Sequence, residues 1–140
     1  MHSPIIPLLL GMILALCMGR ESAYWHVGPA QITDGDTLKI GRQGFRLKGV
    51  AAPERATLPG LAARDFAVAQ FGGRWIACHE TGRLSLSRYE AFCYTLAGED
   101  IGAAVIRAGH ACASSKAKYR VFGYEALERA DRPKDCGNGA

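Results

Sequence analysis

The stretch that decides the fold covers residues 27–54 and reads VGPAQITDGDTLKIGRQGFRLKGVAAPE. It carries one turn signal at Asp34-Gly35 and a second one at residues 41–44. Around these turns, apolar and polar residues alternate in short segments, and Pro53 ends the last of them. We therefore predict three short antiparallel strands, at residues 28–32, 37–40 and 45–48.

The last of these segments shows which way its side chains point. Because successive side chains of a strand point to opposite faces, Phe45 and Leu47 share one face. Arg46 and Lys48 share the other. The sequence therefore predicts a sheet with an apolar face toward a core and a basic face toward something else.

The composition allows one domain with a modest core, because the chain has 140 residues. Hydrophobic residues make up 49% of the chain and charged ones 21%, a balance that excludes an intrinsically disordered protein. The formal net charge of +4 suits a surface that binds polyanions, although many unrelated exported domains share such a charge.

The remainder of the chain predicts helices around two further strands. Ala62, Phe66 and Ala69 recur at helical spacing after Pro59-Gly60, and Gly72-Gly73 ends this helix. We further predict strands at 75–78 and 87–94, and helices at 101–108 and about 122–129. Five strands with helices on their open sides predict a small α+β protein, a closed five-stranded barrel.

The first 23 residues differ from the rest. Residues 5–18 are almost wholly apolar and carry no Lys, Arg, Asp or Glu, and this run is too short to span a bilayer. We predict a signal peptide at 1–23, cleaved after Gly19 or after Ala23. The alternatives are a retained membrane anchor and a lipoprotein modified at Cys17. Export then predicts a periplasmic or secreted monomer with no stable membrane span, consisting of a domain at 24–130 and a polar tail at 131–140.

Four cysteines remain after such a cleavage, and four cysteines allow three connectivities. We favour the pair Cys78–Cys93, whose members would lie at opposite ends of a hairpin, together with Cys112–Cys136. The alternative is four reduced, half-buried thiols. The cysteines and histidines show none of the spacings of a zinc site.

The quoted stretch resembles the staphylococcal nuclease (thermonuclease) family, and its exported bacterial members most closely. The shared pattern is Asp-Gly-Asp-Thr at 34–37, an arginine-bearing strand, and Gly-Val-Ala-Ala-Pro-Glu at 49–54. In the second half, the spacing agrees at a looser set of positions: Cys78, Arg88, Ala91, Cys93, 98–101 and 108–109. The resemblance covers about residues 28–130 and implies a barrel of the OB type.

The resemblance also implies an activity, the hydrolysis of phosphodiester bonds in single-stranded DNA or RNA with the help of Ca²⁺. It implies that Asp36 is a calcium-binding carboxylate, that Arg46 and Arg88 clamp the phosphate, and that Glu54 is the general base for water. These residue types suit the chemistry, because guanidinium groups offset the charge that builds up at phosphorus and a carboxylate can take a proton from water.

Two departures from the family pattern bear on this activity. The family has a second metal-binding aspartate where this chain has Ala51, so we expect calcium binding to be weakened or lost. Asp34 and the backbone carbonyl of Ala52 are candidates to compensate. The residues before Arg88 also differ from the family pattern, which leaves Arg83 as a rival for the second arginine.

Further candidates for contact with a substrate are Lys48, Lys116 and Tyr119. Lys118 and Arg120 flank the tyrosine, and basic residues with an interleaved aromatic can hold a single strand by charge and stacking. The alternative is a solubilising loop.

The sequence leaves three functions open. The first is an exported, calcium-dependent nuclease that acts on single-stranded nucleic acid. The second is a degenerate relative that binds an anionic ligand, either nucleic acid or another polyanion, with a role in cell-envelope or exopolysaccharide (succinoglycan-type) biosynthesis. The third is a structural or partner-binding envelope protein.

Overall fold

The computed structural model describes residues 25–136 of the chain. The predicted signal peptide, its cleavage sites and the last four residues of the predicted tail lie outside the described residues. The elements follow one another as β1 (Trp25–Asp34), β2 (Thr37–Ile40), β3 (Gln43–Leu47), β4 (Val50–Ala51), α2 (Leu58–Phe71), β5 (Trp75–Ser85), β6 (Arg88–Thr95), α3 (Ile101–Arg107), β7 (Cys112–Ala113) and the 3₁₀ turn η1 (Glu125–Leu127).

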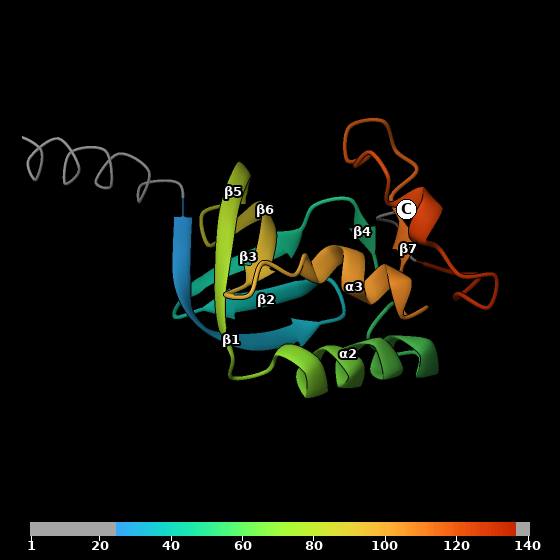
Figure 1. Cartoon of the computed structure of the whole chain (residues 1–140), viewed down its shortest axis with the longest axis horizontal. Coiled ribbons are helices and arrows are strands. Elements are labelled where there is room, and N and C mark those ends of the chain that lie inside the picture. Colours follow the sequence, from blue (N-terminus) through green and yellow to red (C-terminus); the bar gives the residue numbers. More distant parts are fainter. Residues whose placement is uncertain (1–24, 137–140) are drawn as a thin grey trace, which may run out of the picture.

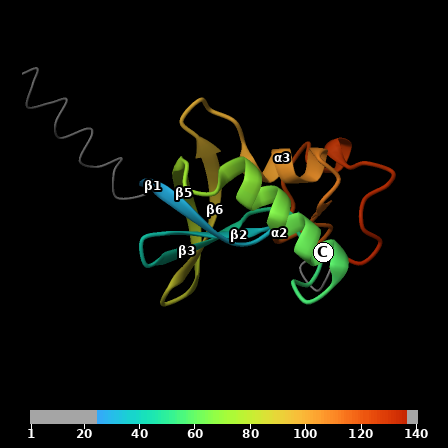
Figure 2. The ribbon, with the colours of Figure 1, turned by 90° about the horizontal axis from the view of Figure 1, so that it is seen from below.

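Five of these strands close into a barrel in the order β1-β2-β3-β6-β5 (Figure 1). The sheet is mixed, because β3 pairs with β6 in parallel and the other neighbours are antiparallel. Helix α2 lies along β1, and α3 lies beside β6, as the two views agree (Figures 1 and 2). The predicted five-stranded α+β barrel is confirmed.

The side chains of β3 and of the residue after it divide between the core and the outer face of the barrel. Phe45 and Leu47 are buried in the core, whereas Arg46 and Lys48 lie half-buried on the outer face. Removing such apolar side chains from water contributes about 25 cal/mol per Å² of buried area, which is the main force that holds small domains together. The predicted division of this strand into an apolar and a basic face is therefore confirmed.

Helix α2 begins earlier than predicted. Thr57 is its N-cap and accepts a hydrogen bond from the backbone N–H of Gly60, so Pro59 lies inside the first turn, where a missing N–H is harmless. Gly60 packs closely on the preceding loop, since a Cβ there would lie 1.8 Å from the carbonyl oxygen of Glu54. The helix ends at Phe71 before Gly72, as predicted.

Two other expectations were wrong, and one further element was missed. The predicted helix at 122–129 is only the 3₁₀ turn η1. Strand β5 runs on to Ser85 rather than ending at Cys78, and it forms a long hairpin with β6. A second, two-stranded sheet of β4 and β7 was not expected, because segments of two residues leave no periodic signal.

Both predicted disulfides are present. Cys78 and Cys93 are direct cross-strand partners in β5 and β6, with Cα atoms 4.0 Å apart. Cys112 and Cys136 join β7 to the C-terminal segment. Within residues 25–136, no helix combines the length and the apolar character that crossing a bilayer requires.

Candidate functional site

A pocket of about 280 Å³ opens on the outer face of the barrel. Its floor comes from β3 and β6 and the turn after β3, and its walls come from the β5–β6 hairpin and the segment 114–119. The residues that line it are Arg46, Leu47, Gly49, Val50, Leu84, Arg88, Glu90, Ser114, Lys116 and Tyr119. Four of the residues predicted to contact a substrate therefore meet here: Arg46, Arg88, Lys116 and Tyr119.

The parallel pairing of β3 with β6 places the charged side chains. Arg46 is the register partner of Glu90, and Arg88, two residues earlier on β6, lies on the same face. The lining thus contains three cations, Arg46, Arg88 and Lys116, and one carboxylate, Glu90. Because guanidinium groups are planar forks that match the oxygens of a phosphate or carboxylate, this balance favours an anionic ligand.

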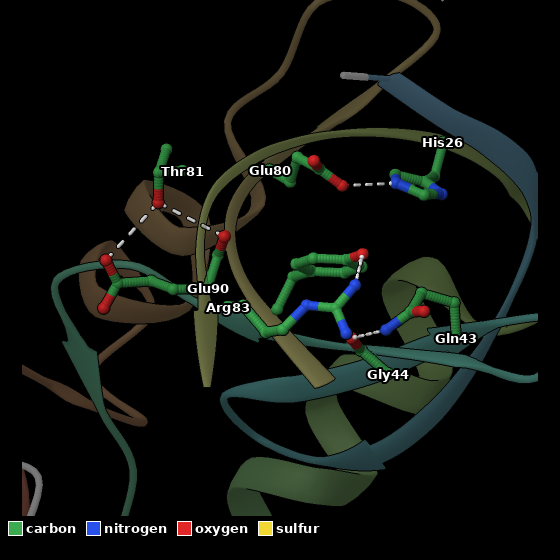
Figure 3. A network of polar contacts seen from close by, with 8 residues as sticks. His26, Gln43, Gly44, Glu80, Thr81, Arg83 and Glu90 are labelled. Carbon is green, nitrogen blue, oxygen red and sulfur yellow. Dashed lines mark hydrogen bonds and ion pairs between the residues drawn. The ribbon is translucent and has the colours of Figure 1, made fainter. Parts of the chain in front are cut away.

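Glu90 is a member of the pocket that the sequence reasoning missed. Its carboxylate lies 3.8 Å from Lys48 Nζ. Thr81 Oγ1 lies 3.3 Å from Glu90 Oε1 (Figure 3). Lys48 thereby offsets much of the negative charge of Glu90. The signal that could have found it is the alternation along β6, which places Glu90 on the same face as Arg88.

Backbone contacts hold the segment 114–119 over the pocket. The N–H of Ser114 donates to the carbonyl of Gly49 at 2.8 Å. Gly49 has φ +77°, and a Cβ there would lie 2.4 Å from a side-chain methyl of Val121, so only glycine fits at this position.

Tyr124, five residues after this segment, is held against the start of α3. Its hydroxyl donates to Asp100 Oδ2 at 2.6 Å, and Asp100 also caps α3 through the N–H of Ala103. Burial, followed by the hydrogen bond and the negative charge of Asp100, raises the pKa of Tyr124 well above its ordinary value. The phenol therefore stays protonated and keeps donating across the pH range in which proteins function.

The basic residues around Tyr119 are arranged in different ways. Lys118 Nζ lies 5.3 Å from the centre of the Tyr119 ring, and Arg120 donates two hydrogen bonds to Glu125. Of residues 116–120, Lys116 and Tyr119 line the pocket.

Asp36 is held by two hydrogen-bond donors and by an ion pair with Arg46. Its Oδ1 accepts from the Thr37 hydroxyl at 3.0 Å, and its Oδ2 accepts from the N–H of Ala52 at 3.1 Å. Arg46 Nη2 lies 3.8 Å from the same Oδ2. The side chain is 15% exposed. The predicted neighbours Asp36, Arg46 and Ala52 are thus brought together.

These contacts do not fit a calcium ion. Calcium takes six to eight oxygen ligands, whereas Asp36 faces a guanidinium group and two hydrogen-bond donors. Ala52 donates its N–H to Asp36. Asp34 lies 3.3 Å from Arg55 Nε. Among residues 25–136, no group of three or more His, Cys, Asp or Glu could hold a metal.

Glu54, the predicted general base, lies outside the pocket lining. Its side chain is exposed, and its backbone carbonyl accepts hydrogen bonds from Thr57 at the start of α2. The residue therefore positions the loop before the helix, and its carboxylate lies in solvent.

The structure distinguishes between Arg88 and Arg83, the two candidates for the second phosphate-clamping arginine. Arg88 lines the pocket, whereas Arg83 Nη2 donates to the Tyr89 hydroxyl at 2.7 Å with the guanidinium over the Tyr89 ring (Figure 3). Tyr89 points to the opposite face of β6 from Arg88, toward His26 and Phe45. Arg83 is thus held on the side of β6 away from the pocket.

Comparison with known proteins gives no further assignment. No protein-family model matches the chain, and no curated protein matches it significantly.

Proposed function

We propose that this protein is a staphylococcal-nuclease-like barrel that binds the phosphodiester backbone of a single-stranded nucleic acid without calcium. The observation that carries the proposal is the pocket in which Arg46, Arg88 and Lys116 surround the same space of about 280 Å³. Tyr119 in the lining adds an aromatic ring on which a base or sugar can pack. The two disulfides support export to an oxidising compartment, the periplasm or the exterior.

Binding without calcium is favoured over calcium-dependent hydrolysis by the state of the acidic residues. Asp36 uses both carboxylate oxygens to hold Ala52 and Thr37. Ala51, where the resembling family has a metal ligand, is fully buried in β4. Glu54 is exposed and does not line the pocket. The retained arginines therefore serve to hold an anion.

Hydrolysis is the second candidate, and the contact between Asp36 and Arg46 favours it. In the resembling family the calcium carboxylate and a phosphate-clamping arginine lie in one site, and here Arg46 Nη2 lies 3.8 Å from Asp36 Oδ2. Incubating the protein at micromolar concentration with denatured DNA and with RNA, with calcium and with a chelator, tests this candidate directly. Cleavage that the chelator stops would replace the proposal of binding alone.

The binding itself is tested with a fluorescently labelled single-stranded oligonucleotide, followed by anisotropy in the presence of a chelator. A hydrogen bond to a charged group contributes about 1.5–3 kcal/mol, so Arg46→Gln and Arg88→Gln should each weaken binding by about 10- to 150-fold. Arg64→Gln is the matched control, because Arg64 lies on α2 and pairs with Asp65. We expect less than a twofold change for it.

Two results would contradict the proposal. Equal weakening by all three substitutions would mean that the net charge of +4 attracts the oligonucleotide without a specific pocket. Tighter binding of an acidic polysaccharide than of the oligonucleotide, with the same dependence on Arg46 and Arg88, would assign the pocket to an envelope polymer.

A further inference from the structure

A row of side chains crosses the outer face of the barrel next to the pocket. Phe92 on β6 is the cross-strand partner of His79 on β5, and His79 is the partner of Trp25 on β1. Direct cross-strand partners have their side chains on the same face of the sheet. Lys48 extends the row on the other side, because its backbone N–H donates to the carbonyl of Ala91.

The side chains of this row contact one another. The Trp25 and His79 rings have centroids 4.9 Å apart, and the Tyr94 ring lies 6.2 Å from Trp25. Lys48 Nζ lies 5.8 Å from the centre of the Phe92 ring. Trp25 is 39% exposed, and the other three aromatic side chains are half-buried. We call the set Trp25, His79, Phe92, Tyr94 and Lys48 the aromatic row.

The aromatic row continues directly from the pocket. Lys48 lies 3.8 Å from Glu90, which lines the pocket, and 5.8 Å from Phe92, which lies in the row. Glu90 and Phe92 are two residues apart on one face of β6, a separation of about 7 Å. An extended ligand held by the pocket arginines therefore reaches the aromatic rings without leaving this face.

We propose that the aromatic row stacks the bases of a single-stranded nucleic acid whose backbone phosphate lies in the pocket. This inference rests on the proposed function and deepens it, because it assigns the ligand to strands of several nucleotides. Every base has a flat face that can stack on an aromatic ring, while the pocket cations attract the backbone. An acidic polysaccharide supplies the negative charge but has no bases, so stacking on the rings favours nucleic acid.

The two tryptophans of the chain permit a direct test. Trp75→Phe leaves Trp25 as the only tryptophan, and Trp25→Phe leaves Trp75, which is 57% exposed and lies beside Pro29 on the same face of β5 as His79, four residues from it. Titration with a single-stranded oligothymidylate should quench the fluorescence of Trp25 in the first variant. It should leave the fluorescence of Trp75 unchanged in the second variant.

Affinities separate this inference from the proposed function. Stacking contributes about 1–3 kcal/mol per base, so Trp25→Ala should weaken binding of the oligothymidylate about 5- to 150-fold. Binding of inorganic polyphosphate, which has the charge but no bases, should change less than twofold. Trp75→Ala is the matched control and should leave both affinities unchanged.

Four outcomes would overturn the inference. If Arg88→Gln weakens oligonucleotide binding and Trp25→Ala does not, the phosphate pocket stands and the stacking surface is wrong. If Trp25→Ala weakens the binding of both ligands equally, the row only maintains the shape of the barrel. Unfolding measurements would then show that the variant is less stable than the wild type. If an acidic polysaccharide quenches Trp25 and the oligonucleotide does not, the row binds sugars. If sedimentation shows a dimer that Trp25→Ala dissociates, the row is an interface between two copies of the chain.

Discussion

Replacing Asp36 by asparagine tests the role of this carboxylate. It accepts hydrogen bonds from the N–H of Ala52 at 3.1 Å and from the hydroxyl of Thr37 at 3.0 Å. Asparagine keeps one acceptor oxygen but places an amino group, itself a donor, against one of these donors. Since a hydrogen bond to a charged group contributes about 1.5–3 kcal/mol, we expect Asp36→Asn to lower the free energy of unfolding by about 2–4 kcal/mol.

The same substitution should strengthen the binding of an anion. Asp36 Oδ2 lies 3.8 Å from Arg46 Nη2, and Arg46 is 32% exposed. The Coulomb energy of this pair is about 1 kcal/mol at the dielectric constant of water and about 4 kcal/mol at an effective value of 20. Because a bound phosphate competes with Asp36 for the guanidinium group, even the lower figure corresponds to an affinity about fivefold higher in the variant.

Urea unfolding followed by circular dichroism measures the first effect, and anisotropy with a labelled oligonucleotide and a chelator measures the second. Asp65→Asn is the control, because it makes the same change in net charge on an exposed part of α2. It should change neither quantity appreciably. An Asp36→Asn variant that remains folded and binds the oligonucleotide ten times more weakly would refute the reasoning, because Asp36 would then hold a cation that the ligand needs.

Two further predictions concern the rest of the scaffold. Burial and the hydrogen bond to Asp100 raise the pKa of Tyr124, so the unfolded chain loses the phenolic proton before the folded protein does. The contribution of Tyr124 to the free energy of unfolding should therefore be complete below pH about 10 and decrease as the pH rises further. Tyr124→Phe should make the alkaline decrease of the free energy of unfolding less steep in urea titrations. Ala51→Asp should lower the free energy of unfolding by about 2–4 kcal/mol, because it buries a carboxylate in β4. Calcium should raise the melting temperature of this variant and leave the wild type and the equally buried control Ala67→Asp unchanged; a calcium response in the wild type would contradict the proposed loss of the metal site.

Much of the barrel could be predicted from local patterns. The alternation around Phe45 and the turn at Asp34-Gly35 predict strands without knowledge of the tertiary structure, because they depend only on neighbouring residues. The hairpin that brings Cys78 and Cys93 together follows in the same way from its two strand-like flanks. Where the signal was weak, as in the helix expected at 122–129, packing of the segment against α3 and the turn after β3 decided the conformation.

The residues of the candidate site were partly predictable. Arg46 and Arg88 were recognised from sequence motifs, and they line one pocket because β3 pairs in parallel with β6. Glu90 was missed because the alternation along β6 places it only on the face of Arg88, and the pairing of β6 with β3 is needed to place it beside Arg46 in the pocket. Glu54 was expected to act as the general base; the structure shows that its backbone carbonyl holds the start of α2 and that its side chain is exposed.

The sequence alone determined the strand pattern, the turns and the candidate arginines and favoured one cysteine pairing, because these depend on residue type and short-range spacing. The tertiary structure alone decided that Asp36 anchors Ala52 and Thr37, that Arg83 turns away to Tyr89, and that the aromatic row runs on from the pocket. These features depend on which strands become neighbours and on the direction of each side chain, and only closing the barrel sets both.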